Sequence, residues 1–217
     1  RSIAGRDPAA MAEAARLAEA AGAHAIDINM GCPAKRVVGG YAGSALMREP
    51  ELAVALARET IAAVDVPVSV KMRLGWDADS LNAPDLARQL EAEGVALITV
   101  HGRTRQQFYK GEADWPAIRA VRDAISLPLV ANGDCANAQD ARQMLAASGA
   151  DAVMIGRAAV GQPWLVGRIA AGLCGRDWRE PSPAEKAEAA LEHYMSLLAT
   201  FGREQGVRHA RKHLAAY

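Results

Sequence analysis

The sequence predicts an α/β protein: a (β/α)8 barrel whose first two βα units are missing, followed by a small all-α helical domain. A short apolar stretch followed by an amphipathic helix recurs six times, which is the pattern of parallel α/β architecture. Polar and reactive residues gather at the carboxyl ends of the expected strands, where barrels build their sites. The first strand is not followed by a G-x-G-x-x-G turn, which disfavours a dinucleotide-binding open sheet. Since ordinary barrels need about 250 residues, six units in 217 residues predict two absent units.

Six strands are expected from the apolar stretches, and the last four are nearly continuous apolar runs, as for strands covered on both faces. The expected strands are 2–4, 25–29, 66–72, 97–101, 128–132 and 152–155.

The intervening helices carry start and stop signals. Pro8 and Pro50 stand at first helical positions, and Asn82 and Asn137 are expected N-caps. Three glycines close helices just before the next strand, where a left-handed residue is commonly needed. These glycines are Gly22, Gly94 and Gly149.

The pattern changes after residue 155, so we expect a barrel domain over 1–174 and the start of a truncated helical domain over 182–217. Residues 162–172 are expected to form the last outer helix, and 174–183 a linker. Ser182-Pro183-Ala184-Glu185 is a capping box that predicts a helix to about Phe201. A further basic segment, 206–217, follows and ends without a C-cap.

Composition excludes several classes of protein. Apolar residues make up 51% of the chain, and no apolar run approaches the roughly 18 residues of a membrane span. The 25 Lys and Arg balance 25 Asp and Glu, so a polyanion must be held by a local basic cluster. Three scattered cysteines, none in a C-x-x-C pair, indicate neither a disulfide framework nor a metal centre and favour a reducing cytoplasm.

Cys32 is the leading candidate for a reactive group. It follows a strand in Asn29-Met30-Gly31-Cys32-Pro33, at the active-site end of a barrel, where a core-packing role is unfavourable. A free thiol, with a pKa near ~8.5, is mostly protonated at neutral pH and can act as a general acid. Proton donor and nucleophile both remain open. Cys135 also lies in a strand-end loop, and Cys174 lies in the linker without reactive neighbours. Cys32 ranks first by its surroundings.

Two further strand ends carry candidate ligand-binding side chains. Lys71 ends an apolar run, where an ammonium must pair with an acid or face a ligand. His101 holds the equivalent place one strand on and is either structural or a ligand contact.

The last two strands end in Asn132-Gly133-Asp134 and Gly156-Arg157, where barrels often hold a phosphate. Glycine permits close backbone approach, and Arg157 can add a bidentate contact. A phosphorylated ligand is therefore expected, although Asn-Gly is also a common turn.

These motifs together resemble the tRNA-dihydrouridine synthases, closest to the bacterial B-type subgroup. The matching motifs, in order, are N-M-G-C-P-A-K, G-S-A-L-M, V-K-M-R-L-G-W, H-G-R-T-R, A-N-G-D, M-I-G-R-A-A and R-H-A-R-K-H-L-A-A-Y. In that family an FMN-bearing barrel is followed by a helical tRNA-binding domain. Two departures stand out: Ser2 replaces the usual flavin-contacting Gln, and the family's first strand, with its Pro-Met segment, has no counterpart. We therefore expect the 217 residues alone to bind FMN weakly or not at all, even if the natural protein is an active enzyme.

The resemblance implies an oxidoreductase that reduces uridine to 5,6-dihydrouridine in tRNA. Reduced FMN would deliver hydride to C6, Cys32 would donate a proton to C5, and NADPH (or NADH) would reduce the flavin again. Asn29 would touch the uracil. The FMN-binding residues implied are Lys71, His101, Asn132, Gly133, Asp134, Gly156 and Arg157.

The target base must leave its stack to react, so basic side chains are needed to hold the RNA backbone. The candidates are Lys35, Arg36, Arg103, Arg105, Arg208, Arg211 and Lys212. No membrane, metal or protein partner is implied.

Three other functions remain open. The chain could be an FMN-dependent reductase or dehydrogenase of free pyrimidines, which would have no need of basic terminal helices. It could be a catalytically silent RNA-binding remnant, as Ser2 and the missing strands suggest. A non-redox phosphate-binding barrel, such as an isomerase, is more distant.

Overall fold

The computed structural model describes residues 1–217 and contains one six-stranded, wholly parallel sheet. Each strand pairs with the next along the chain, in the order β1 to β6. The strands are β1 (Ser2–Ile3), β2 (Ile26–Met30), β3 (Val68–Arg73), β4 (Leu97–His101), β5 (Leu129–Asn132) and β6 (Ala152–Met154). The six expected strands are confirmed, with ends shifted by no more than two residues.

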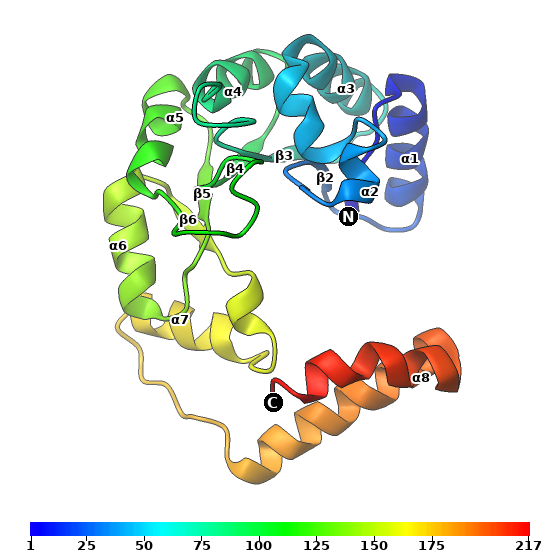
Figure 1. The fold of residues 1–217 in the computed structure, drawn as a ribbon, viewed down its shortest axis with the longest axis vertical. Coiled ribbons are helices and arrows are strands. Elements are labelled where there is room, and N and C mark those ends of the chain that lie inside the picture. The colour runs from blue at the N-terminus through cyan, green and yellow to red at the C-terminus, as the bar shows by residue number, and fades with distance from the viewer. The chain divides into compact units, whose positions relative to one another are not determined.

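Helices follow the strands, and the order of the sheet never reverses. Because crossovers between parallel strands are right-handed, an unreversed order puts the connecting helices on one face and curls the sheet toward a barrel. Figure 1 shows α1, α3, α4 and α5 around the outside of this sheet. The fold is thus a partial (β/α)8 barrel followed by an all-helical segment. The α-helices are α1 (Pro8–Ala20), α2 (Lys35–Val38), α3 (Pro50–Ala62), α4 (Ala83–Ala92), α5 (Arg119–Ala124), α6 (Ala138–Ser148), α7 (Leu165–Leu173) and α8 (Pro183–Leu214), and the 3₁₀ turns are η1 (Gly43–Arg48), η2 (Pro116–Ile118) and η3 (Arg157–Ala159).

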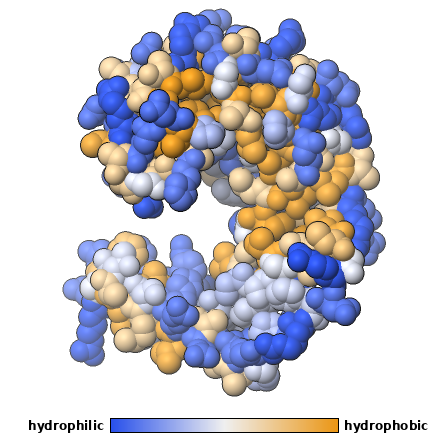
Figure 2. Space-filling model, turned by 180° about the vertical axis from the view of Figure 1, so that it is seen from behind, coloured by the Kyte–Doolittle hydropathy of each residue, from blue (hydrophilic) through white to orange (hydrophobic).

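The two faces of the sheet differ in chemistry. Side chains alternate along a strand, so β3 turns Val68, Val70 and Met72 to one face and Ser69 and Lys71 to the other. The first three side chains are at most 3% exposed and belong to the core beneath the helices. In the part of the molecule that contains the sheet, Figure 2 shows hydrophilic residues around the outer rim and hydrophobic residues farther in. The expectation of continuous apolar runs is therefore wrong for β3, because its inward-facing positions are polar.

The chain divides into two compact units, which are described separately. Unit 1 comprises residues 1–133 and 143–154, and unit 2 comprises residues 134–142 and 155–217. None of the helices combines the length and apolar character needed to cross a membrane.

Most of the expected helix signals are confirmed. α1 begins at Pro8 and α3 at Pro50, and the Asn137 side chain accepts a hydrogen bond from the Asp140 N–H. The three closing glycines all have positive φ, between 67° and 94°. Asn82 is an exception, since it precedes α4 without capping it. Its amide donates instead to the Met47 carbonyl at 2.8 Å, which ties α4 to η1.

Helix α8 is two helices joined at a kink. Gly202 has φ 73° and ψ 167°, which interrupts the helix after Phe201, where the capping box predicted its end. The capping box is present: Ser182 Oγ accepts from the Glu185 N–H, and Glu185 accepts from the Ser182 N–H. Arg179 and these bonds lower the pKa of Glu185 to about 2. The second half, 203–214, packs back on the first, with the His193 and His213 rings 4.8 Å apart.

We predict that Gly206→Ala destabilises this helical hairpin. A Cβ on Gly206 would lie 2.8 Å from the Leu197 carbonyl oxygen and 2.9 Å from Leu198 Cα, so the two halves would have to move apart. Overpacking of this kind costs about 1–3 kcal/mol, which thermal unfolding and proteolysis of residues 183–214 would detect. Gly40→Ala is the control, because its Cβ would meet only an ordinary contact at 3.5 Å. Equal stability of the two variants would contradict the close packing.

Candidate active site

The inner face of the sheet in unit 1 carries two rows of polar side chains. Strand pairing sets Asn29 beside Lys71 and Lys71 beside Thr99. The next row toward the carboxyl ends sets Arg73 beside His101 and His101 beside Asn132. Since paired residues of parallel strands share a face, side chains from four strands converge on one end of the sheet.

Cys32 lies in a loop that Asn29 and Ser44 hold in place. The Asn29 side-chain oxygen accepts hydrogen bonds from the N–H groups of Gly31 (3.0 Å) and Cys32 (2.9 Å). The Cys32 carbonyl accepts from the Ser44 hydroxyl at 2.9 Å and the Ser44 N–H at 3.1 Å. Cys32 itself is half-buried, and its loop begins at the end of β2 beside the polar rows. The side-chain oxygen of Asn29 is thus committed to the loop, which leaves only its amide N–H groups for a ligand.

Arg73 is the buried link between this loop and the loop after β4. Its side chain is 1% exposed and donates to the carbonyls of Gly31 (2.8 Å), Thr104 (2.8 Å) and Phe108 (2.9 Å). Three backbone acceptors, and no carboxylate, satisfy the guanidinium. Arg73 therefore fixes the Cys32 loop and residues 104–108 relative to each other.

Lys71 has no hydrogen-bonding or ion-pair partner, although it is partly buried. The neighbouring carboxylate of Asp27 accepts from Ser2 and Ser69 instead, so the salt bridge that could have explained Lys71 is absent. Burial and, second, the charge of Arg73 lower the pKa of Lys71, while Asp27 and Cys32 oppose the shift. An unpaired ammonium beside the Cys32 loop is suited to a polar or anionic ligand.

His101 and Asn132 close the inner face at β4 and β5. His101 is 7% exposed, and its Nε2 lies 3.3 Å from an Arg103 nitrogen. The Asn132 amide donates to the Met154 carbonyl at 2.9 Å and so holds the end of β6. Gly133 follows at φ 123°, and a Cβ there would lie 2.6 Å from Ala113 and 3.0 Å from His101. Only glycine fits this position.

The remaining expected phosphate-binding residues lie in unit 2. Asp134 has φ 59°, and its carboxylate accepts from Arg157 at 3.2 Å. Gly156 precedes η3 and has open space where a Cβ would stand. Because Asp134 pairs with Arg157, it orients that guanidinium, and its own negative charge opposes direct contact with a phosphate.

The other cysteines have different surroundings. Cys135 is 3% exposed, and burial, followed by Asp140, raises the pKa of its thiol against the effect of a hydrogen bond to Asn137. Cys174 is exposed beyond α7. Of the three cysteines, only Cys32 is both half-buried and next to the polar rows.

The expected RNA-contacting residues of unit 1 divide between surface and interior. Lys35 and Arg36 are exposed on α2, directly after the Cys32 loop. Arg103 requires a correction: it is 2% exposed and donates to the carbonyls of Lys110 and Gly111, so it supports a loop and cannot reach an RNA backbone. Arg105 is half-buried against the Trp76 ring at 4.7 Å.

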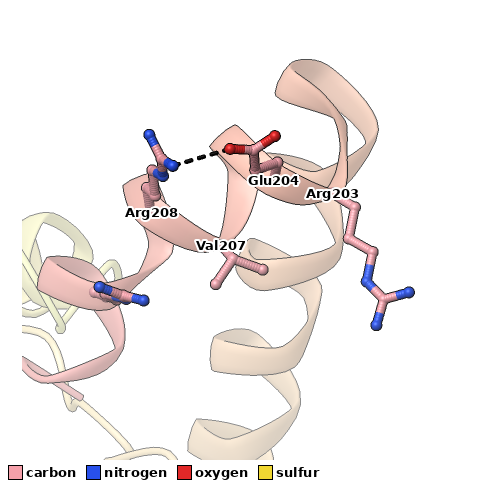
Figure 3. Close-up of a pocket in the computed structure, with 5 residues that line it drawn as sticks. Arg203, Glu204, Val207 and Arg208 are labelled. Carbon is pink, nitrogen blue, oxygen red and sulfur yellow. Dashed lines mark hydrogen bonds and ion pairs between the residues drawn. The ribbon is translucent and has the colours of Figure 1, made fainter.

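The basic residues of unit 2 surround a hollow on the second half of α8. Arg203, Val207, Arg208 and Arg211, with Glu204, line a space of about 400 Å³, and Figure 3 shows Arg208 turned onto Glu204 while Arg203 points away. The Arg208–Glu204 pair is 2.9 Å long and exposed, so its strength is small. Lys212 follows Arg211 in the sequence and is exposed.

A family model described as Dihydrouridine synthase (Dus) matches residues 2–217. The chain belongs to this family. A probable tRNA-dihydrouridine synthase of Rhizobium leguminosarum bv. phaseoli is 56% identical to the chain over 215 residues, 99% of the chain and 66% of the relative. A tRNA-dihydrouridine synthase B of Xanthomonas axonopodis pv. citri is 49% identical over 99% of the chain and 65% of the relative, which supports the B-type subgroup. The chain spans about two thirds of the length of these relatives.

A solved structure supports the fold of this dihydrouridine synthase family member. A dipeptide epimerase from Enterococcus faecalis V583 matches with a TM-score of 0.50 at 16% identity, over 70% of this chain and 36% of the epimerase. At that identity the likeness concerns the fold alone.

The two buried arginines of this family member are not indicated by the sequence motifs. Arg73 belongs to a strand-end motif that assigns it no role, and Arg103 matches the pattern of an exposed RNA contact. A usable signal was present, since both stand at or just beyond the end of a strand, where a charged side chain must find buried partners.

We predict that Lys71→Met raises the melting temperature at pH 7 by about 2–4 °C, since it removes an unpaired, partly buried charge. The lowered pKa of Lys71 means that the folded protein loses this proton at lower pH than the unfolded chain. The cost of the charge therefore shrinks as pH rises through the folded pKa, and the advantage of the variant should be smaller at pH 10 than at pH 7. Thermal unfolding without added ligands measures both values.

The exposed Lys35→Met is the control and should leave the melting temperature unchanged. A lower melting temperature for Lys71→Met would show that the ammonium has a stabilising partner.

Proposed function

We propose that this protein reduces uridine to 5,6-dihydrouridine in tRNA, with FMN as the bound cofactor and NADPH as the reductant. The observation that carries the proposal is the unpaired Lys71 ammonium on a polar sheet face next to the Cys32 loop. Family membership over residues 2–217 and relatives named as tRNA-dihydrouridine synthases support the substrate.

The residues on the inner face fit a flavin ring, and those at the start of η3 fit a phosphate. The ammonium of Lys71 suits a ring that carries carbonyl oxygens and gains negative charge on reduction. Within unit 2, the open space at Gly156 leaves backbone available for a phosphate, and Arg157 adds a guanidinium. His101 and Asn132 stand in the row next to Lys71, toward the carboxyl ends of the strands. When bound, FMN supplies the hydride that reaches C6 of the uracil.

Cys32 holds the proton that C5 receives. Its loop is fixed on one side by Asn29 and Ser44 and on the other by Arg73, so the thiol keeps its place while a base enters. The remaining N–H groups of Asn29 donate to a carbonyl oxygen of the uracil and orient the ring. A positioned general acid contributes typically 10²–10⁴-fold to a rate.

The exposed basic side chains outside this face hold the RNA. Lys35 and Arg36 follow the Cys32 loop, and Arg208, Arg211 and Lys212 lie on α8. Arg103 is excluded from this role by its burial. A reductase of free pyrimidines would not use the arginines around the hollow of α8, which favours tRNA as the substrate.

The direct test uses the natural protein at its full length and measures its visible spectrum, its bleaching by NADPH, and the dihydrouridine that it forms in tRNA, detected by mass spectrometry. We expect a yellow protein that NADPH decolourises and that converts uridine in unmodified tRNA. A colourless protein that takes up no added FMN would overturn the flavin assignment, and a yellow protein active only on free uracil would overturn the tRNA substrate.

We predict that Cys32→Ala lowers dihydrouridine formation by about 10²–10⁴-fold and far more than it lowers flavin reduction by NADPH, because only the former needs the proton. The two rates are measured separately, by mass spectrometry of tRNA and by stopped-flow absorbance. Cys174→Ala, an exposed cysteine beyond α7, is the matched control and should change neither. Undiminished product from Cys32→Ala would refute its role as proton donor.

A further inference from the structure

Arg48, Trp76, Arg105 and Phe108 form a stack of alternating cationic and aromatic groups in unit 1, called here the arginine ladder. The Arg48 guanidinium lies 3.8 Å from the centre of the Trp76 ring, and the Arg105 guanidinium 4.7 Å from it. Arg105 also lies 5.4 Å from the centre of the Phe108 ring. These residues follow the carboxyl ends of β2, β3 and β4, as do Cys32 and the polar rows.

The ladder leads toward the inner face of the sheet. Phe108 meets Tyr109 edge-on at 6.1 Å, and Tyr109 lies 6.5 Å from the ring of His101. A continuous series of rings and guanidiniums therefore connects exposed Arg48 with His101, one of the residues assigned to the flavin.

The two arginines of the ladder carry uncompensated charge. Neither Arg48 nor Arg105 forms an ion pair, and Nε of Arg105 is buried without a hydrogen-bond partner. Asp77, which follows Trp76, instead accepts hydrogen bonds from Ser80 and Gln106. A guanidinium stacked on a ring keeps its in-plane N–H groups available, which is the geometry that binds phosphate.

The ladder is also held in position by the backbone. The Arg105 N–H donates to the Gly75 carbonyl at 3.0 Å, and the Gln106 N–H to the Trp76 carbonyl at 2.9 Å. Arg73 fixes the same loop from beneath through Thr104 and Phe108. Such pre-organisation reduces the entropy lost when a ligand binds.

We propose that the arginine ladder is a phosphodiester-binding site for the single-stranded RNA next to the target uridine, with Arg48 and Arg105 contacting the phosphates and Trp76 aligning both. The inference rests on the proposed function, since it assigns a binding site to the RNA strand whose base must leave the stack to reach Cys32. Alternation of cationic and aromatic groups is typical of tracks for single-stranded nucleic acid.

The test is the affinity of the purified protein for unmodified tRNA as a function of salt. Loss of one phosphate contact should weaken binding and reduce the slope of log K against log salt by about 0.7–0.9. We expect this change in Arg48→Gln, with an affinity loss of about threefold to tenfold near 0.1 M salt. Arg88→Gln, which removes an exposed arginine paired with Asp85 on α4, should match the wild type.

Trp76→Leu tests the alignment of the two guanidiniums and should weaken tRNA binding, whereas Trp76→Phe should restore most of it. Thermal unfolding verifies that each variant is folded. If Trp76→Leu does not fold, Arg48→Gln still tests the inference, because Arg48 is exposed and its replacement should not disturb the fold. The inference is overturned if Arg48→Gln equals Arg88→Gln in both affinity and slope. It is also overturned if Arg48→Gln raises the KM for NADPH and leaves tRNA affinity unchanged, since the phosphate bound would then be that of the reductant.

The same measurements separate this inference from the proposed function. If the wild type forms dihydrouridine and Arg48→Gln binds tRNA as tightly as the wild type, the role of the arginine ladder is refuted and the enzyme assignment stands. Arg48-dependent tRNA binding without any dihydrouridine keeps the ladder and removes the enzyme assignment.

Discussion

The buried guanidinium of Arg73 is the interaction on which the site depends. It joins the loop after β2, which carries Cys32, to the loop after β4, which carries Phe108, through hydrogen bonds that span 31 to 42 residues of sequence. Without it, three backbone carbonyls would lose a charged donor, and each buried unsatisfied group costs about 1–3 kcal/mol. Both the thiol and the arginine ladder therefore keep their positions because one side chain is sequestered beneath them.

The zero net charge of the chain conceals a local excess of positive charge on one face of the sheet and in the loops next to it. The outer face of the sheet is apolar and covered by helices, whereas the inner face places Lys71 and His101 in adjacent rows. Lys71, Arg48 and Arg105 carry positive charge without acidic partners. In the proposed reaction these charges meet the cofactor and the RNA backbone, so the local excess of positive charge is met by the ligands.

Much of the fold was predictable because its signals are local. Apolar stretches located six strands, glycines with positive φ marked the helix ends, and Ser182 with Glu185 marked the start of α8. The Cys32 loop was also recognisable from its strand-end position. The burial of Arg73 and Arg103 was not, because their partners are backbone carbonyls in loops whose proximity only the folded chain creates. Composition likewise could not show that β3 alternates between core and polar face.

The central claim is that tRNA reaches Cys32, in the loop beside the inner face of the sheet. The most direct measurement is the rate of alkylation of each cysteine, followed by mass spectrometry, with and without saturating unmodified tRNA. The account predicts that tRNA slows alkylation of Cys32 severalfold and leaves that of exposed Cys174 unchanged. Equal alkylation of Cys32 in the presence and absence of bound tRNA would contradict it.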